Sequence, residues 1–127
     1  MTTKLPIDCV LALTYNCNAR CNMCDIWKIK NSPELTLEDV SKLPSSLRDV
    51  NLSGGEPFLR RDLPEIVAAV RKACPKARMV ISTNGFLTPV IDKAMDKILQ
   101  IAPDIGVAIS IDGIGEMHNT VRGIPGG

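Results

Sequence analysis

Three of the chain's five cysteines lie within eight residues, in the run Cys17-Asn-Ala-Arg-Cys21-Asn-Met-Cys24. Thiolates are the soft ligands that iron prefers in iron–sulfur clusters, and one short loop lets three of them converge. Full ligation of a cubane cluster takes four cysteines, so this spacing leaves the fourth iron open to a small molecule. An open coordination position on a redox cluster indicates chemistry rather than electron storage.

A zinc site is the alternative use of the same cysteines. Structural zinc is almost always bound by four cysteine or histidine ligands, and here only three cysteines are close together. The single histidine, His118, lies far along the chain and is interpreted as a packing residue. Cys9 falls inside a predicted strand and Cys74 at the end of a predicted helix, so neither is expected to be a ligand.

Three further segments carry polar or flexible residues that could contact a ligand. They are Ser53-Gly-Gly-Glu-Pro57, Ser82-Thr-Asn-Gly85, and Ser110-Ile-Asp-Gly113 with Arg122-Gly123 downstream. Glycines let the backbone approach a ligand closely, and Glu56 supplies an acceptor for a cationic amine. Taken alone, each segment would be an ordinary turn. The first also lacks the Gly-x-Gly-x-x-Gly spacing, which excludes a dinucleotide-binding loop.

Together with the cysteine triplet, these segments resemble the radical S-adenosylmethionine enzymes in order and approximate spacing, from about Cys9 to the last residue. The resemblance implies that Cys17, Cys21 and Cys24 bind a [4Fe–4S] cluster, whose fourth iron the amine and carboxylate of S-adenosylmethionine chelate. It implies reductive cleavage of that cofactor to a 5′-deoxyadenosyl radical, which abstracts a hydrogen atom from a substrate. Many members have an aromatic residue at the position of Met23, which is expected to keep an apolar lid near the adenine.

The resemblance also implies cofactor contacts outside the cysteine loop. They are Gly54, Gly55, Glu56 and Pro57 at the amino group, Ser82 and Asn84 at cofactor or substrate, Ser110 and Asp112 at the ribose hydroxyls, and Arg122 at a carboxylate. For Arg122 a surface salt bridge is an equal alternative. Replacing Glu56 is expected to spare cluster assembly but to abolish cofactor binding.

Four short apolar runs predict the strands of a sheet. They cover residues 8–14, 49–53, 78–82 and 105–111. The intervening segments predict helices that begin after a Thr36 cap, after an Asp62 cap, at Thr88-Pro89 and near Gly115. The motifs come directly after the strands, where parallel α/β sheets place their sites.

Alternating strands and helices predict an α/β fold with a parallel sheet. By the family resemblance, these βα units form an incomplete part of a (βα)6 partial TIM-like barrel. Residues 1–127 are then the N-terminal portion of the core domain, truncated after the fourth strand. An unprotected edge on that strand predicts a dimer or a domain swap.

Composition narrows the class of protein further. The chain has 127 residues, 45% of them hydrophobic, and a formal net charge of +1. This balance predicts no binding to nucleic acid by charge, and four aromatic residues offer few stacking platforms. The N-terminus lacks a signal-peptide pattern, no run is long enough to span a membrane, and the odd cysteine count does not fit a disulfide framework. A reducing cytoplasm is expected.

Two partners follow from the enzyme hypothesis. One is a one-electron reductant such as flavodoxin or ferredoxin, and the other is an unknown substrate, either a peptide or a small molecule. The rival hypotheses are a non-catalytic iron–sulfur or zinc-binding module and a cluster-free inactive fragment.

Overall fold

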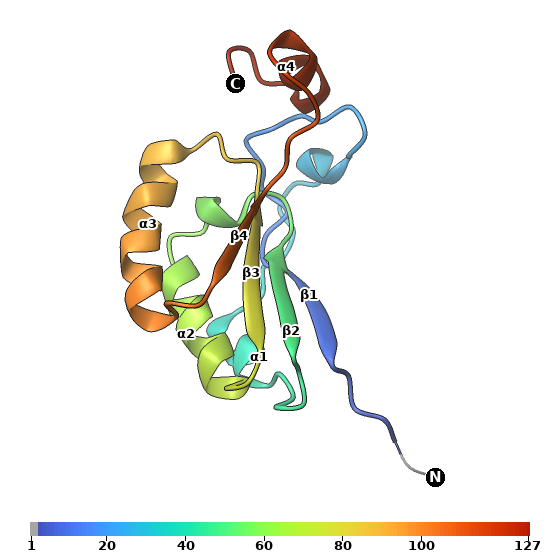
Figure 1. Cartoon of the computed structure of the whole chain (residues 1–127). Helices are drawn as coiled ribbons and strands as arrows, with labels where there is room; N and C mark the ends of the chain where they lie inside the picture. The colour runs from blue at the N-terminus through green and yellow to red at the C-terminus, as the bar shows by residue number, and fades with distance from the viewer. Residues whose placement is uncertain (1–2) are drawn as a thin grey trace.

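The computed structural model describes residues 3–127, which fold around one four-stranded parallel sheet. Its strands are β1 (Asp8–Ala12), β2 (Asp49–Ser53), β3 (Arg78–Thr83) and β4 (Gly106–Ile109), arranged in the order in which they occur along the chain. Because all neighbouring strands pair in parallel, all four carboxyl ends meet at one edge of the sheet (Figure 1).

Helices cover one face of this sheet. α1 (Leu37–Ser41), α2 (Leu63–Ala73) and α3 (Thr88–Ile101) lie on the same side, whereas α4 (Glu116–Arg122) lies beyond the carboxyl ends of the strands (Figure 1). Two short 3-10 turns, η1 (Ile26–Lys28) and η2 (Pro57–Leu59), complete the elements. The α/β class and the parallel βα units that the sequence predicts are confirmed.

The core lies between the sheet and its covering helices. Along β2 and β3 the buried apolar residues alternate with partly exposed ones, so Leu52 and Ile81 pair on the covered face with no exposed surface. α2 packs against them with a stripe of fully buried residues that includes Ile66 and Val70. The opposite face is open, and there Ser82 donates a hydrogen bond of 2.9 Å to Asn51.

Several predicted boundaries are corrected by the structure. The first strand ends at Ala12 rather than residue 14, and β4 covers 106–109 rather than 105–111. Val10 of β1 is 70% exposed because it lies on the open face, which no helix covers. Ile109 of β4 shares the covered face with Thr83, at the edge of the sheet, and is 59% exposed. Both apolar runs therefore extend beyond the residues that form the strand. Pairing of the β4 edge with another chain stays a prediction.

All four predicted helix starts are right in position, but one of the two predicted side-chain caps does not form. Thr36 forms a capping box with Asp39: the Thr36 hydroxyl accepts from the Asp39 N–H, and the Asp39 carboxylate accepts from the Thr36 N–H. Hydrogen bonds from the Thr36 N–H and hydroxyl to the Asp39 carboxylate lower the pKa of Asp39. Asp62 precedes α2, but its side chain does not cap the helix. The expected Asp62 cap is therefore wrong, because Arg60 takes up its carboxylate.

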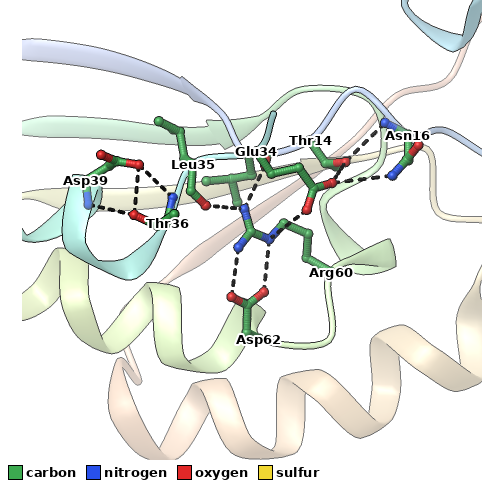
Figure 2. Close-up of polar contacts among 9 residues, drawn as sticks. Thr14, Asn16, Glu34, Leu35, Thr36, Asp39, Arg60 and Asp62 are labelled. Atoms are coloured by element: carbon green, nitrogen blue, oxygen red, sulfur yellow. Dashed lines mark hydrogen bonds and ion pairs between the residues drawn. The ribbon is translucent and has the colours of Figure 1, made fainter. Parts of the chain in front are cut away.

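Arg60 joins three separate segments of the chain. Its side chain is 9% exposed and donates to the carbonyls of Leu13, at 2.9 Å, and Leu35, at 2.6 Å. Its Nε and Nη2 atoms bind the two oxygens of Asp62 at 2.9 and 2.8 Å, and Glu34 lies 3.9 Å away (Figure 2). The guanidinium thus connects the end of β1, the segment before α1 and the start of α2.

A neighbouring network continues toward the cysteines. Glu34 Oε1 accepts from the Thr14 hydroxyl, in a short contact, and from the Asn16 side chain at 3.4 Å (Figure 2). The Thr14 hydroxyl in turn accepts from the Asn16 N–H at 3.1 Å. The residues directly before Cys17 are therefore held in place from the side of α1.

Replacing Arg60 by Met is expected to lower the free energy of unfolding by roughly 2–4 kcal/mol, because two part-buried carbonyls and a carboxylate lose their donor. The neighbouring Arg61→Met exchange is the matched control, since Arg61 is exposed. Urea denaturation measures both, and equal midpoints would contradict the role given to Arg60.

The ion pair between Arg60 and Asp62 predicts that the free energy of unfolding depends on pH. Hydrogen bonds from Arg60 lower the pKa of Asp62 below its ordinary value. The stability that this pair contributes is present above the unfolded-state pKa of about 3.9 and is lost as pH falls through the folded-state pKa. Denaturation at pH 7 and pH 3 should show the difference between wild type and Arg60→Met narrowing in acid.

Candidate functional site

A pocket of about 150 Å³ lies at the carboxyl ends of the strands. Its lining includes most of the residues that the sequence singled out: Cys17, Cys21, Met23, Cys24, Gly54, Gly55, Ser82, Asn84, Ser110 and Arg122. Of the predicted set, Glu56, Pro57 and Asp112 do not line it. The loops after all four strands therefore contribute to one site, as parallel sheets require.

The cysteine loop places its three thiols around this pocket at different depths. Cys21 is buried, Cys17 is half-buried and Cys24 is exposed. Burial raises the pKa of the Cys17 thiol; a backbone hydrogen bond from Ala19 lowers it, and the negative charge of Glu56 raises it further.

The donor set fits an iron–sulfur cluster. Three cysteine sulfurs on one loop line one pocket, which is also lined by the glycines Gly54 and Gly55. Within residues 3–127, no three His, Cys, Asp or Glu side chains converge closely enough to coordinate one ion. The three thiols therefore share the pocket without a preformed coordination geometry.

Gly54 and Gly55 let the chain pass against the backbone that precedes Cys17. Gly54 has a φ of +119°, and a Cβ atom there would lie 2.3 Å from the Thr14 carbonyl oxygen. A Cβ on Gly55 would lie 2.1 Å from the carbonyl oxygen of Asn16. The Gly55 N–H donates to the Thr14 carbonyl at 2.7 Å. Only glycine fits at both positions, because the obstructing atoms belong to the backbone.

Glu56 faces the protein interior rather than the pocket. Its side chain has no exposed surface. Oε1 accepts from the Thr83 hydroxyl at 2.7 Å and from the Phe58 N–H at 3.2 Å, and Oε2 accepts from the Asn84 N–H at 2.9 Å. The Glu56 N–H donates to the Asn16 carbonyl at 2.9 Å. The carboxylate therefore joins the glycine segment to the end of β3 and uses both oxygens to do so.

Two polar side chains of the site already have partners within the protein. The amide of Asn84 donates to Asn18 at 2.8 Å and lies 4.0 Å from the Cys17 sulfur. Asp112 forms an ion pair with Arg122, so both are engaged with each other.

His118 is a packing residue, as interpreted from the sequence. Its Nδ1 accepts from the Asp112 N–H at 3.1 Å, and its ring lies 5.6 Å from that of Phe86. Cys74 is a fully buried packing residue whose sulfur donates to the Pro44 carbonyl.

Thr83 and Asn18 are among the residues of the site that were not assigned a role from the sequence. Thr83 lines the pocket and binds Glu56, and Asn18 accepts from Asn84. Thr83 could have been predicted to lie at the site, because it is the last residue of a strand. Nothing in the sequence pattern pairs Asn18 with a residue 66 positions away.

The family model described as the Radical SAM superfamily matches residues 11–126. The chain therefore belongs to the radical SAM superfamily. Among curated proteins it is similar to an Fe-coproporphyrin III synthase from Methanosarcina barkeri, with 37% identity over 121 residues, 90% of this chain and 29% of that enzyme. It also resembles a pre-heme d1 synthase from Dinoroseobacter shibae, with 38% identity over 126 residues, again covering 90% of this chain and 29% of the relative.

Solved structures share the fold. SuiB from Streptococcus suis bound to S-adenosylmethionine superposes with a TM-score of 0.76 at 21% identity, covering 94% of this chain and 28% of that one. BtrN in complex with AdoMet and 2-DOIA gives 0.65 at 25% identity, over 90% of this chain and 48% of BtrN. The chain thus spans less than a third of the curated relatives named above.

Replacing Glu56 by Gln is expected to lower the free energy of unfolding by about 1–3 kcal/mol, because an amide cannot accept from all three donors. Glu65→Gln, on the exposed side of α2, is the matched control. Urea denaturation without iron measures both variants. If Glu56→Gln were as stable as wild type, the inward-facing carboxylate would not hold these segments together.

Proposed function

We propose that this chain supplies the cluster- and cofactor-binding part of a radical SAM enzyme, in which Cys17, Cys21 and Cys24 hold a [4Fe–4S] cluster. The observation that carries the proposal is that three thiols line one pocket with Gly54 and Gly55, at the carboxyl ends of a parallel sheet. When bound, the reduced cluster supplies one electron that breaks the sulfonium–carbon bond of S-adenosylmethionine, giving methionine and a 5′-deoxyadenosyl radical that takes a hydrogen atom from substrate.

The chain's own residues bind and orient in this proposal. Ser82, Asn84 and Ser110 present polar groups to the pocket from the ends of β3 and β4, where hydroxyls or carboxylates of the cofactor would be bound. Met23 lies on the rim and is 62% exposed, so it can cover an apolar ring. These contacts orient the cofactor relative to the cysteines.

The glycine segment has two tasks in this proposal. Gly54 and Gly55 line the pocket and present backbone without side chains to the cofactor's amino group. Glu56 and Pro57 lie behind them, outside the pocket lining. We therefore assign Glu56 a positioning role: it holds the glycines and Asn84 in place, in contrast to the expected direct contact with the amine.

The proposed partners of this chain are a reductant and a substrate. A one-electron reductant such as flavodoxin or ferredoxin is required to reduce the cluster. A peptide or a small molecule is the proposed substrate, in keeping with the SuiB structure described as bound to precursor peptide SuiA, which covers 94% of this chain at 21% identity. No helix among residues 3–127 is long and apolar enough to cross a membrane, and we retain the cytoplasm as the proposed location.

Anaerobic reconstitution with iron and sulfide tests the proposal. The dithionite-reduced chain should show an EPR signal of a [4Fe–4S]⁺ cluster that changes on addition of S-adenosylmethionine, because the cofactor binds the open iron. Exchanging Cys17, Cys21 or Cys24 for alanine should reduce the iron content several-fold, whereas Cys9→Ala should retain it as the matched control.

Other results would favour the rival hypotheses. A cluster signal that ignores S-adenosylmethionine would support a non-catalytic iron–sulfur module. Tight binding of one zinc ion instead of iron would support a zinc module. A chain that takes up neither metal would be a cluster-free fragment.

A further inference from the structure

The last turn of α4 lies directly against the cysteine loop. The Arg20 N–H donates to the Arg122 carbonyl at 2.8 Å, and the Asn22 N–H donates to the Val121 carbonyl at 3.0 Å. Gly123 follows with a φ of +65°, and a Cβ atom there would lie 2.5 Å from the Arg20 carbonyl oxygen. The backbone on both sides of Cys21 is thus fixed to a helix about 100 residues further along the chain (Figure 1).

The side chain of Arg122 reaches the sulfur of Cys21. Its Nη1 atom donates to Cys21 Sγ at 3.5 Å, and its Nε atom forms a close ion pair with Asp112 Oδ2. The Arg122 side chain is 12% exposed and that of Asp112 is 25% exposed. The guanidinium is therefore held between a carboxylate on one side and a cysteine sulfur on the other.

Asp112 is itself held in position. Its N–H donates to Nδ1 of His118 at 3.1 Å, and that ring packs against Phe86. Within the described part of the chain, Asp112 Oδ2 and Arg122 Nε are buried and have this ion pair as their polar contact. The carboxylate fixes the direction of the guanidinium, because a buried charge without its partner is strongly unfavourable.

A cationic N–H donor at a thiolate sulfur has a predictable effect on a bound cluster. Hydrogen bonds to the sulfurs and the local charge set the reduction potentials of iron–sulfur clusters. A charged donor stabilises the more negative, reduced state, and it does so strongly in a partly buried site. Asn84, which faces Cys17 at 4.0 Å, is neutral and more distant.

We propose that Arg122 is a positioning residue that sets the reduction potential of the bound cluster through its N–H···S hydrogen bond to Cys21, with Asp112 orienting the guanidinium. This inference rests on the proposed function. It gives Arg122 a task at the cluster itself, in addition to the carboxylate contact expected from the sequence. Loss of the positive donor should make the cluster harder to reduce.

The test is an EPR-monitored redox titration of the anaerobically reconstituted chain without S-adenosylmethionine. Arg122→Met removes both charge and donor, Arg122→Gln keeps a donor without charge, and Arg122→Lys keeps the charge but not the planar fork. The midpoint potential should shift to more negative values in all three, furthest in the Met variant. Arg78→Met is the matched control, because it removes an exposed arginine that pairs with Asp49 at the amino ends of β2 and β3.

The outcomes separate this inference from the proposed function. An unchanged midpoint in an iron-replete Arg122→Met variant would overturn the inference while leaving the proposed function intact. If the Met variant takes up no iron, the same titration is made on the Gln and Lys variants. A more negative midpoint potential in them supports the inference, and an unchanged one overturns it. Failure of all three to take up iron would also overturn it, since Arg122 would then serve the loop's structure alone. A wild-type chain without a cluster would overturn the proposed function itself.

Discussion

The site depends on one buried carboxylate. Glu56 has no exposed surface, yet three donors from two different segments converge on its oxygens. A buried carboxylate is tolerated only when its acceptors are satisfied, so the positions of Thr83 and Asn84 are linked to that of the glycine segment. The Glu56 N–H also binds the carbonyl of Asn16, directly before the first cysteine of the loop. The cysteine loop, the glycine segment and the end of β3 therefore form one unit.

That arrangement has an electrostatic consequence. Burial and the nearby negative charge of Glu56 both raise the pKa of the Cys17 thiol, which opposes the thiolate that a cluster needs. Arg122, by contrast, brings a positive charge to Cys21. Cys17 and Cys21 therefore have neighbouring charges of opposite sign.

The sequence predicted the elements better than the contacts between them. Hydrophobic alternation and cap residues located all four strands and the four main helices, because those signals are local. Arg60 and Arg122 carried no such signal: their partners Leu13 and Cys21 are 47 and 101 residues away. The predicted Asp62 cap is wrong because the pattern does not show which nearby donor the carboxylate binds, and Arg60, 2 residues earlier, is that donor. The inward direction of Glu56 was not predicted either, since its donors Thr83 and Asn84 are 27 and 28 residues away.

The register of β3 explains why Glu56 turns inward. Successive side chains of a strand point to opposite faces, so Ser82 lies on the open face and in the pocket while Thr83 points to the covered side. Thr83 is 3% exposed and meets the Glu56 carboxylate there. A slip of one residue would exchange the faces of Ser82 and Thr83 and leave the carboxylate without that donor. The pairing of Ile81 with Leu52 on one side and Val107 on the other fixes this register. The apolar core thus determines which polar side chains are available for chemistry.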